Sequence, residues 1–346
     1  MNKLAIFAFL FMTLNVYSQS QQGTTNGRRT RPRNGNAGEV PGEVAPDPKS
    51  LVPSFAPNAR RLGLGSEISL SDLLILRSIL LQRIGYGGRE VGLWASANGN
   101  FVKEAESPRV TTGGLIVAAD KRFCDWLVLG LAGGYSHTSS TDLEANAGWG
   151  GAYAIVSSGG WYINQTAIGG GDGFTTTRDA LGGTAKANGS GWFFSDVTQG
   201  GYNITRGHLT GGPYGLLQYA LSGTPAFSES GSVAPVTVHS GTSSSIVSDL
   251  GLDVSYRLGR LCLKASAAWE HEYSDTTTFT TVNLVGIPSS NTTLAGTSLG
   301  HDSAVISAGI SYLINRLMTV SIGYNGQFGR QNYESNSVSG SIRIAF

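Results

Sequence analysis

Few residues in this chain have the types and the spacing that chemistry requires. The histidines form no HExxH motif and no spacing typical of metal ligands, and no G-x-S-x-G sequence marks a nucleophilic serine. The glycine-rich run Gly169–Gly173 departs from the G-x-G-x-x-G spacing of dinucleotide sites and from the calcium nonapeptide. Close backbone packing on a strand explains this run. We therefore expect no cofactor, no metal and no catalytic centre from these motifs.

Two pairs of residues keep acid–base chemistry open as an alternative. His301 and Asp302 are adjacent, and a surface hydrolase of the β-barrel type uses Asp and His at its mouth, but no second acidic pair accompanies them. Glu270 and Glu272 could act as paired catalytic carboxylates only beside a substrate cleft. The favoured expectation is that the chain is not an enzyme. We predict instead a polar network inside the fold, formed by Lys264, Glu270, Glu272 and Arg343.

The composition narrows the class of fold that must position these side chains. Charged residues make up 14% of the chain, against about 25% in average soluble domains. Glycine is abundant, at 49 of 346 residues, and no apolar run approaches the ~18 residues of a transmembrane helix. A net charge of +1 argues against a nucleic-acid partner, and two cysteines are too few for a disulfide scaffold. A membrane β-barrel is compatible with all of these features.

The N-terminal part of the chain predicts export from the cytoplasm. Residues 1–18 have a basic start at Lys3, an apolar core over Leu4–Leu14 and small residues before a cleavage site, which is the pattern of a signal peptide read by the Sec translocon. Residues 19–65 are rich in Gln, Gly, Asn, Pro and Arg, and we expect them to be a disordered, basic tail. Contact with nucleic acid or anionic lipid is the alternative to a solvated linker.

A single helix is expected after the tail. Ser66–Ile84 begins with capping residues and ends at Gly85, and at about 1.5 Å per residue it would be roughly 28 Å long. Its charged side chains make insertion into lipid costly, so we expect protein to cover its apolar face. The polar positions on this helix are Glu67, Ser71, Arg77, Ser78, Gln82 and Arg83.

From residue 89 onward the hydrophobic pattern has a period of two, which predicts strands with one apolar and one polar face. The last residues, 338–346, show the alternation most clearly. Many of the strands are 10–15 residues long, as a tilted crossing of a bilayer requires. Twelve strands are predicted, at 89–101, 110–121, 126–138, 143–157, 160–175, 185–201, 208–222, 238–257, 260–274, 302–314, 317–330 and 333–346.

The connections between these strands alternate in length. Tight turns alternate with longer connections, of which the longest are 176–184, 223–237 and 275–301. An antiparallel outer-membrane barrel sorts its connections in this way, with an even number of strands. The sequence therefore predicts an all-β membrane protein, a twelve-stranded antiparallel transmembrane β-barrel with the N-terminal α-helix in its pore. Outer-membrane lipid is the expected surrounding.

Several segments together resemble the autotransporter β-domain of classical type V secretion. They are Leu93-Trp94, Gly113-Gly114, Ala119-Asp120, Leu131–Ser136, Gly151–Tyr153, Ala268–Tyr273, His301–Ala304, Gly323–Gly329 and Ile342–Phe346. The resemblance covers residues 66–346. It implies a pore helix at 66–84, a barrel at 89–346, and a bacterial outer-membrane protein delivered by periplasmic chaperones to the barrel-assembly machinery. It also implies that Ile342, Ile344 and Phe346 form the assembly signal.

The family anchors, and helps to export, an N-terminal passenger domain. Here only residues 19–65 separate the predicted signal peptide from the helix, so this segment would be a vestigial passenger. We expect a translocator barrel that anchors or exports its own short N-terminal segment. Two alternatives remain, which are a stand-alone adhesin or pore whose long loops bind a surface partner, and a surface hydrolase.

Overall fold

A computed structural model describes residues 91–104, 109–180 and 182–346 of the chain. Within these ranges there is no helix, and hence none long and apolar enough to cross a membrane. The predicted signal peptide, the tail 19–65 and the helix Ser66–Ile84 lie outside the described residues, as do all six polar positions predicted on that helix.

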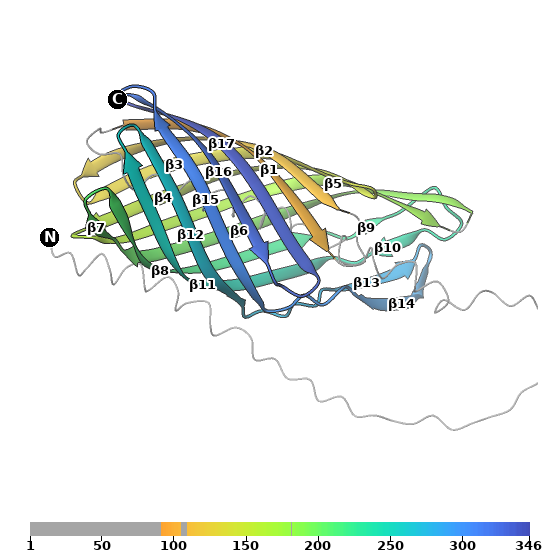
Figure 1. Cartoon of the computed structure of the whole chain (residues 1–346). Helices are drawn as coiled ribbons and strands as arrows, with labels where there is room; N and C mark the ends of the chain where they lie inside the picture. Colours follow the sequence, from red (N-terminus) through yellow and green to blue (C-terminus); the bar gives the residue numbers. More distant parts are fainter. Residues whose placement is uncertain (1–90, 105–108, 181) are drawn as a thin grey trace, which may run out of the picture. The chain divides into compact units, whose positions relative to one another are not determined.

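Twelve antiparallel strands form a closed barrel, which confirms the predicted twelve-stranded barrel (Figure 1). Each strand pairs with its neighbours along the chain, and the barrel closes where the first strand pairs with the last, from Gly92 opposite Ala345 to Glu104 opposite Tyr333. A short strand β7 (Ile204–Arg206) follows β6 and pairs only with β8. The barrel strands are β1 (Val91–Glu104), β2 (Val110–Cys124), β3 (Leu127–Ser140), β4 (Leu143–Ser158), β5 (Trp161–Ala180), β6 (Gly183–Tyr202), β8 (Leu209–Thr224), β11 (Gly241–Leu258), β12 (Leu261–Glu272), β15 (Asp302–Leu313), β16 (Met318–Phe328) and β17 (Tyr333–Ala345).

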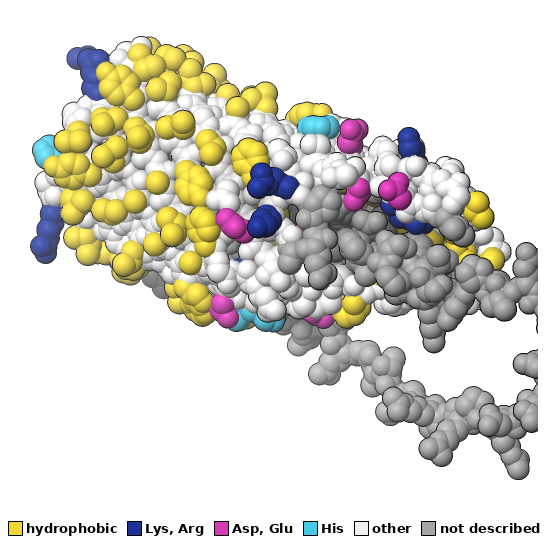
Figure 2. All heavy atoms as spheres, turned by 45° about the vertical axis from the view of Figure 1, so that its right-hand side comes forward, with side chains coloured by type: hydrophobic (Ala, Val, Ile, Leu, Met, Phe, Trp, Pro, Cys, Tyr) yellow, Lys and Arg dark blue, Asp and Glu magenta, His cyan; other side chains and the backbone are white. Residues whose placement is uncertain are grey.

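The alternation in sequence becomes an apolar outside and a largely polar inside. On β17 the side chains of Val338, Ile342 and Ile344 are exposed on the outer wall, whereas Ser337 and Ser339 are buried inside. Polar side chains that would be solvated on a soluble sheet are therefore enclosed by the barrel. Figure 2 shows hydrophobic side chains spread over the barrel wall, with charged side chains mainly toward its two ends in that view.

Glycine is abundant partly because large rings lie against the inner wall. A Cβ atom added to Gly130 would lie 2.2 Å from the ring of Tyr153, and one added to Gly134 would lie 2.3 Å from the ring of Trp149. Both rings belong to β4 and cover glycines of the neighbouring strand β3. The glycines thus make room for aromatic packing inside a narrow barrel.

The two ends of the barrel differ, as the alternating connections predict. One end, which we call the short-turn end, has tight turns with left-handed glycines such as Gly159 (φ 61°), Gly207 (φ 62°) and Gly259 (φ 58°). Both Val91 and Phe346 lie at this end, where their backbones exchange hydrogen bonds. The other end, which we call the extended end, carries the longer connections (Figure 1).

Of the three long connections predicted at the extended end, two are long, around 225–240 and 273–301, whereas 176–184 is not a long loop. Residues 176–180 and 183–184 continue β5 and β6, which pair as a hairpin up to Ala180 opposite Gly183. The other two connections contribute a separate four-stranded sheet, because their Val, Thr and Phe residues alternate and can bury one face. We call it the extension sheet. Its strands are β9 (Phe227–Ser228), β10 (Val236–Val238), β13 (Phe279–Leu284) and β14 (Ile287–Ala295).

Candidate functional site: the barrel lumen

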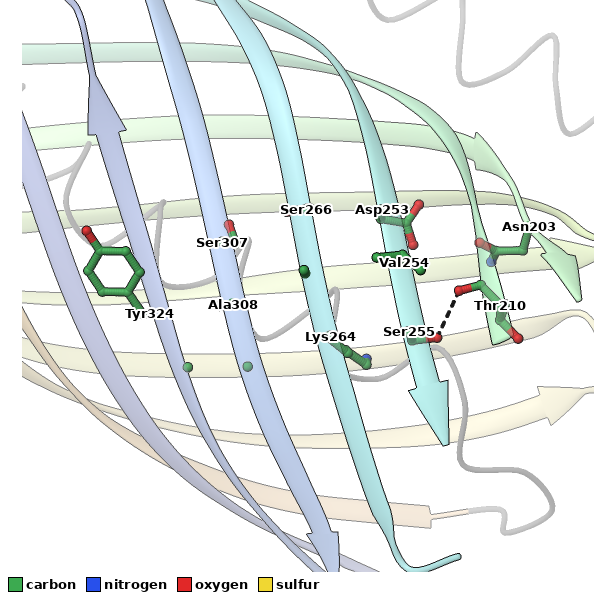
Figure 3. Close-up of a pocket in the computed structure, with 13 residues that line it drawn as sticks. Asn203, Thr210, Asp253, Val254, Ser255, Lys264, Ser266, Ser307, Ala308 and Tyr324 are labelled. Atoms are coloured by element: carbon green, nitrogen blue, oxygen red, sulfur yellow. Dashed lines mark hydrogen bonds between the residues drawn. The ribbon is translucent and has the colours of Figure 1, made fainter. Parts of the chain in front are cut away.

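The lumen has one bulky wall and one wall of small side chains. Strands β4, β5 and β6 direct large buried residues inward, among them Trp149, Ile168 and Phe193. Strands β11, β12, β15 and β16 direct mainly small residues to the same space. A pocket opens along these four strands (Figure 3), and its lining includes Asp253, Ser255, Lys264, Ser266, Ser307, Gly309 and Gly323. This pocket therefore lies against the small-residue wall.

Lys264 brings a positive charge to this pocket near the short-turn end. It is the fourth residue of β12, the strand that follows the turn at Gly259, and Asp253 of β11 lines the pocket beside it (Figure 3). Ser255 of β11 donates a hydrogen bond to the Thr210 carbonyl oxygen at 3.2 Å, which holds the strand beside β8. An amine and a carboxyl group thus project into the pocket from the small-residue wall.

A hydrogen-bonded cluster spans the closing seam of the barrel at the short-turn end. Trp94 Nε1 donates to the Tyr153 hydroxyl group at 3.0 Å, and this hydroxyl donates to Asp120 Oδ2 at 2.9 Å. Arg343 Nη2 lies 3.7 Å from Asp120 Oδ1. Gly92 lies on β1, between the strand of Arg343 (β17) and the strand of Asp120 (β2). A Cβ atom at Gly92 would come within 2.9 Å of Asp120 and 3.0 Å of Arg343. The absence of a side chain at Gly92 therefore lets the arginine of β17 reach the aspartate of β2 across β1.

The predicted carboxylates Glu270 and Glu272 lie inside the barrel near the extended end. Glu270 Oε1 accepts hydrogen bonds from Ser303 Oγ, at 2.9 Å, and from Gln327 Nε2. Glu272 Oε2 accepts one from Ser245 at 2.5 Å and lies 3.9 Å from Arg330 Nη2. Both side chains are buried. Each carboxylate thus links β12 to neighbouring strands.

The four predicted network residues all face the lumen, but they do not meet in one cluster. Lys264 lies six residues from Glu270 on the same strand, which corresponds to about 20 Å. Arg343 contacts Asp120 instead of a glutamate, and Glu272 lies beside Arg330. Sequence reasoning missed Asp120, Asp253 and Arg330. The alternation pattern places both aspartates on the inward face, so the sequence contained a signal for them. The strand register that brings each residue to its partner could not be obtained from the sequence.

The histidine–aspartate pair of the hydrolase alternative lies on the outside of the barrel at the extended end. Asp302 Oδ1 accepts a hydrogen bond from Trp269 Nε1 at 3.0 Å, and it lies 2.8 Å from His271 Nδ1. His301 Nδ1 lies 2.7 Å from the Glu272 carbonyl oxygen. These contacts attach the start of β15 to the end of β12. No group of three or more metal-ligating side chains occurs among the residues that the structure describes.

The predicted assembly residues lie where the barrel closes. Ile342 and Ile344 are exposed on the outer wall of β17, opposite Ala95 and Leu93 of β1. The Phe346 backbone N–H donates to the Val91 carbonyl oxygen at 2.9 Å, and the phenyl ring is 59% exposed. An exposed aromatic side chain thus lies at the short-turn end of the barrel wall, and aromatic residues of outer-membrane barrels form girdles near the ends of the wall.

Solved structures of translocator domains share this fold. The translocator domain of the autotransporter NalP from Neisseria meningitidis is 17% identical, with a TM-score of 0.66, and the match covers 81% of this chain and 98% of that chain. The β-domain of the Bordetella autotransporter BrkA is 15% identical, with a TM-score of 0.55 and 74% and 100% coverage. The transport unit of AIDA-I from Escherichia coli is 14% identical, with a TM-score of 0.51 and 84% and 100% coverage.

A curated relative and a family model extend the comparison to sequence. An extracellular serine protease of Serratia marcescens is 23% identical over 282 residues, which are 76% of this chain but only 26% of that protein. The chain thus spans about a quarter of that relative's length. Residues 93–325 match the model of the autotransporter beta-domain. The chain therefore belongs to the autotransporter β-domain family, and it is an integral outer-membrane translocator barrel.

Proposed function

We propose that the barrel anchors the chain in the outer membrane and exports its own N-terminal segment, residues 19–65, to the cell surface. The position of Val91 carries this proposal, because the barrel sequence begins at the short-turn end beside Phe346. If that end faces the periplasm, as short turns do in outer-membrane barrels, a segment that precedes Val91 reaches the surface only by crossing the lumen. The predicted helix 66–84 would then remain inside the lumen as the last part to cross.

The charges on the inner wall support the same path. The fully buried charged side chains on the inward faces of the described barrel strands are acidic, namely Glu104, Asp120, Asp172, Asp249, Glu270 and Glu272. The inward basic residues Arg178, Lys264 and Arg343 are partly buried. The predicted helix carries Arg77 and Arg83. An acidic lumen favours these two arginines, and it favours the basic tail while the tail is crossing.

Assembly would use the ends of the sequence. A signal peptide at 1–18 would direct the chain to the Sec translocon, and periplasmic chaperones would carry it to the barrel-assembly machinery. Ile342, Ile344 and Phe346 would then act as the signal, because they present an exposed apolar and aromatic edge on the last strand.

Single-channel conductance in planar bilayers tests the lumen part of this proposal. The intact barrel should conduct ions poorly. Deletion of Ser66–Ile84 should produce a stable conductance through the lumen, along the small-residue wall. A deletion of 19 residues inside the tail, from residue 25 to residue 43, is the matched control and should leave the conductance low. Each variant must first show a folded barrel by its migration on a gel without boiling. Free conductance of the intact protein would contradict a helix in the lumen.

A further inference from the structure

The extension sheet has one edge joined to the barrel and one open edge. Its strand order is β14-β13-β10-β9. Beyond β9, the backbones of Ser230 and Lys186 exchange two hydrogen bonds of 2.9 Å, which connect the sheet to the extended hairpin of β6. β14 pairs with β13 on one side and has no strand neighbour on its other side within the described part of the chain. β14 is therefore an edge strand of the extension sheet (Figure 1).

The sheet is held firmly enough to present this edge in a fixed place. Its inner face buries Val236, Val238, Val282 and Leu294. Beside them, Arg178 of the β5 hairpin makes two hydrogen bonds to Glu229, at 2.8 and 2.6 Å, and both side chains are largely buried. A buried two-bond ion pair of this kind orients its partners strongly. The edge is thus part of a packed structure and not of a free loop.

The backbone groups on the open edge can be assigned from one hydrogen bond. Gly296 donates its N–H to the Thr278 carbonyl oxygen at 2.8 Å, so this residue directs its backbone groups toward β13. Backbone direction alternates along a strand. Thr292 and Leu294 therefore face β13, whereas Thr293 and Ala295 direct their N–H and C=O groups to the open side.

The usual protection of an edge strand is present only in its first half. Natural edges are blocked by charged residues, proline or bulges. Here Pro288 and a register shift between Val282 and Leu284 disturb the start of β14. The second half has neither, and residues 276–300 contain no Asp, Glu, Lys, Arg or His. Open backbone groups on an uncharged, Thr-rich segment favour pairing with another strand.

We propose that β14 is the contact by which two copies of this chain pair through their extension sheets. An antiparallel pair centred on Thr293 places Thr293 against Thr293 of the second copy, and Asn291 against Ala295. No like charges meet in this arrangement, and threonine pairs are favourable across strands. The two-fold relation uses the same edge on both copies, so the contact closes as a dimer. The chain's own tail is a poor occupant, because Pro, Gly and Arg dominate it.

Disulfide trapping tests this pairing directly. In the proposed dimer the two Thr293 Cα atoms lie about 5.5 Å apart, which a disulfide can bridge. Thr281 lies on the neighbouring strand β13 and on the same exposed face of the extension sheet, since its hydroxyl oxygen is 3.1 Å from that of Thr293. Two copies of Thr281 would be separated by three strand spacings, about 14 Å. Thr281→Cys is therefore the matched control.

Purified barrel in detergent, at low protein density, is oxidised and analysed without reductant. Thr293→Cys should form at least ten times more covalent dimer than Thr281→Cys. The parent chain measures the background, because Cys262 is buried and Cys124 ends β2 at the short-turn end. Equal dimer yields for the two variants, or no dimer from Thr293→Cys, would overturn the proposal.

A second measurement avoids the cysteine substitutions. Thr293→Pro removes a backbone N–H that makes no hydrogen bond to β13, and Thr293→Lys adds a charge to the edge. Each substitution should weaken self-association at least tenfold, measured by analytical ultracentrifugation. Thr237→Lys places the same charge on the same face but on β10, two strands from the edge, and should change association less than twofold. A wild-type protein that stays monomeric at every concentration contradicts the dimer. Pore conductance and labelling of the tail do not depend on Thr293, so failure here leaves the export proposal intact.

Discussion

Replacing Tyr153 with phenylalanine should measure how much the seam cluster stabilises the closed barrel. The substitution removes one hydroxyl group, which accepts from Trp94 at 3.0 Å and donates to Asp120 at 2.9 Å, and it keeps the ring that covers Gly130. Because Asp120 loses a donor and the buried indole N–H loses its acceptor, we expect a loss of about 2–4 kcal/mol in the free energy of unfolding.

The assay is urea unfolding in lipid vesicles, followed by tryptophan fluorescence. Tyr135→Phe is the matched control, since its hydroxyl also makes a hydrogen bond, to Asn146 at 2.6 Å, but on the exposed outer face. That variant should lose less than about 1 kcal/mol, because Asn146 Oδ1 keeps its contact with His137 Nδ1 at 3.0 Å and no enclosed donor loses its acceptor. The reasoning fails if the two variants lose the same free energy, because then the enclosed position of Tyr153 contributes nothing.

Two further predictions concern closure of the barrel. Deleting Phe346 removes the backbone bond to Val91 and the exposed ring, so the yield of protein in the outer membrane should fall several-fold, measured by fractionation; an unchanged yield would remove its role as an assembly signal. Because a closed barrel has no free edge from which to unzip, unboiled and boiled samples should migrate differently on a denaturing gel, and identical migration would argue against a closed barrel in detergent.

The sequence predicted the barrel because its physics is local. A strand in a bilayer needs alternating faces, so Val338, Ile342 and Ile344 could be placed outside and Ser337 and Ser339 inside without knowledge of any neighbour. The same rule fails at Asp196, whose carboxylate lies among outward-facing residues of β6 and accepts two hydrogen bonds from Gln165 of β5. Alternation places a residue on a face but does not say which polar groups a lipid-facing wall tolerates.

Contacts between strands could not be predicted, because they depend on register. Arg343 and Asp120 are 223 positions apart. They meet because Asp120 lies opposite Gly92 of β1, and the side chain of Arg343, whose backbone lies opposite Trp94, reaches over Gly92. Likewise, Glu272 lies beside Arg330 through a hairpin two strands away. The extension sheet escaped prediction for another reason. Its strands are as short as two residues, and such lengths carry too little periodicity to be distinguished from loops.

The central claim is that residues 19–65 cross the lumen and emerge on the cell surface. Placing a cysteine at Arg33 and exposing intact cells to a membrane-impermeant thiol reagent tests it most directly. We predict labelling of intact cells at the level reached by Val233→Cys, an exposed position at the extended end and away from β14, while the parent chain stays unlabelled. Labelling that appears only after the outer membrane is broken would contradict the account, since the N-terminal segment would then remain in the periplasm.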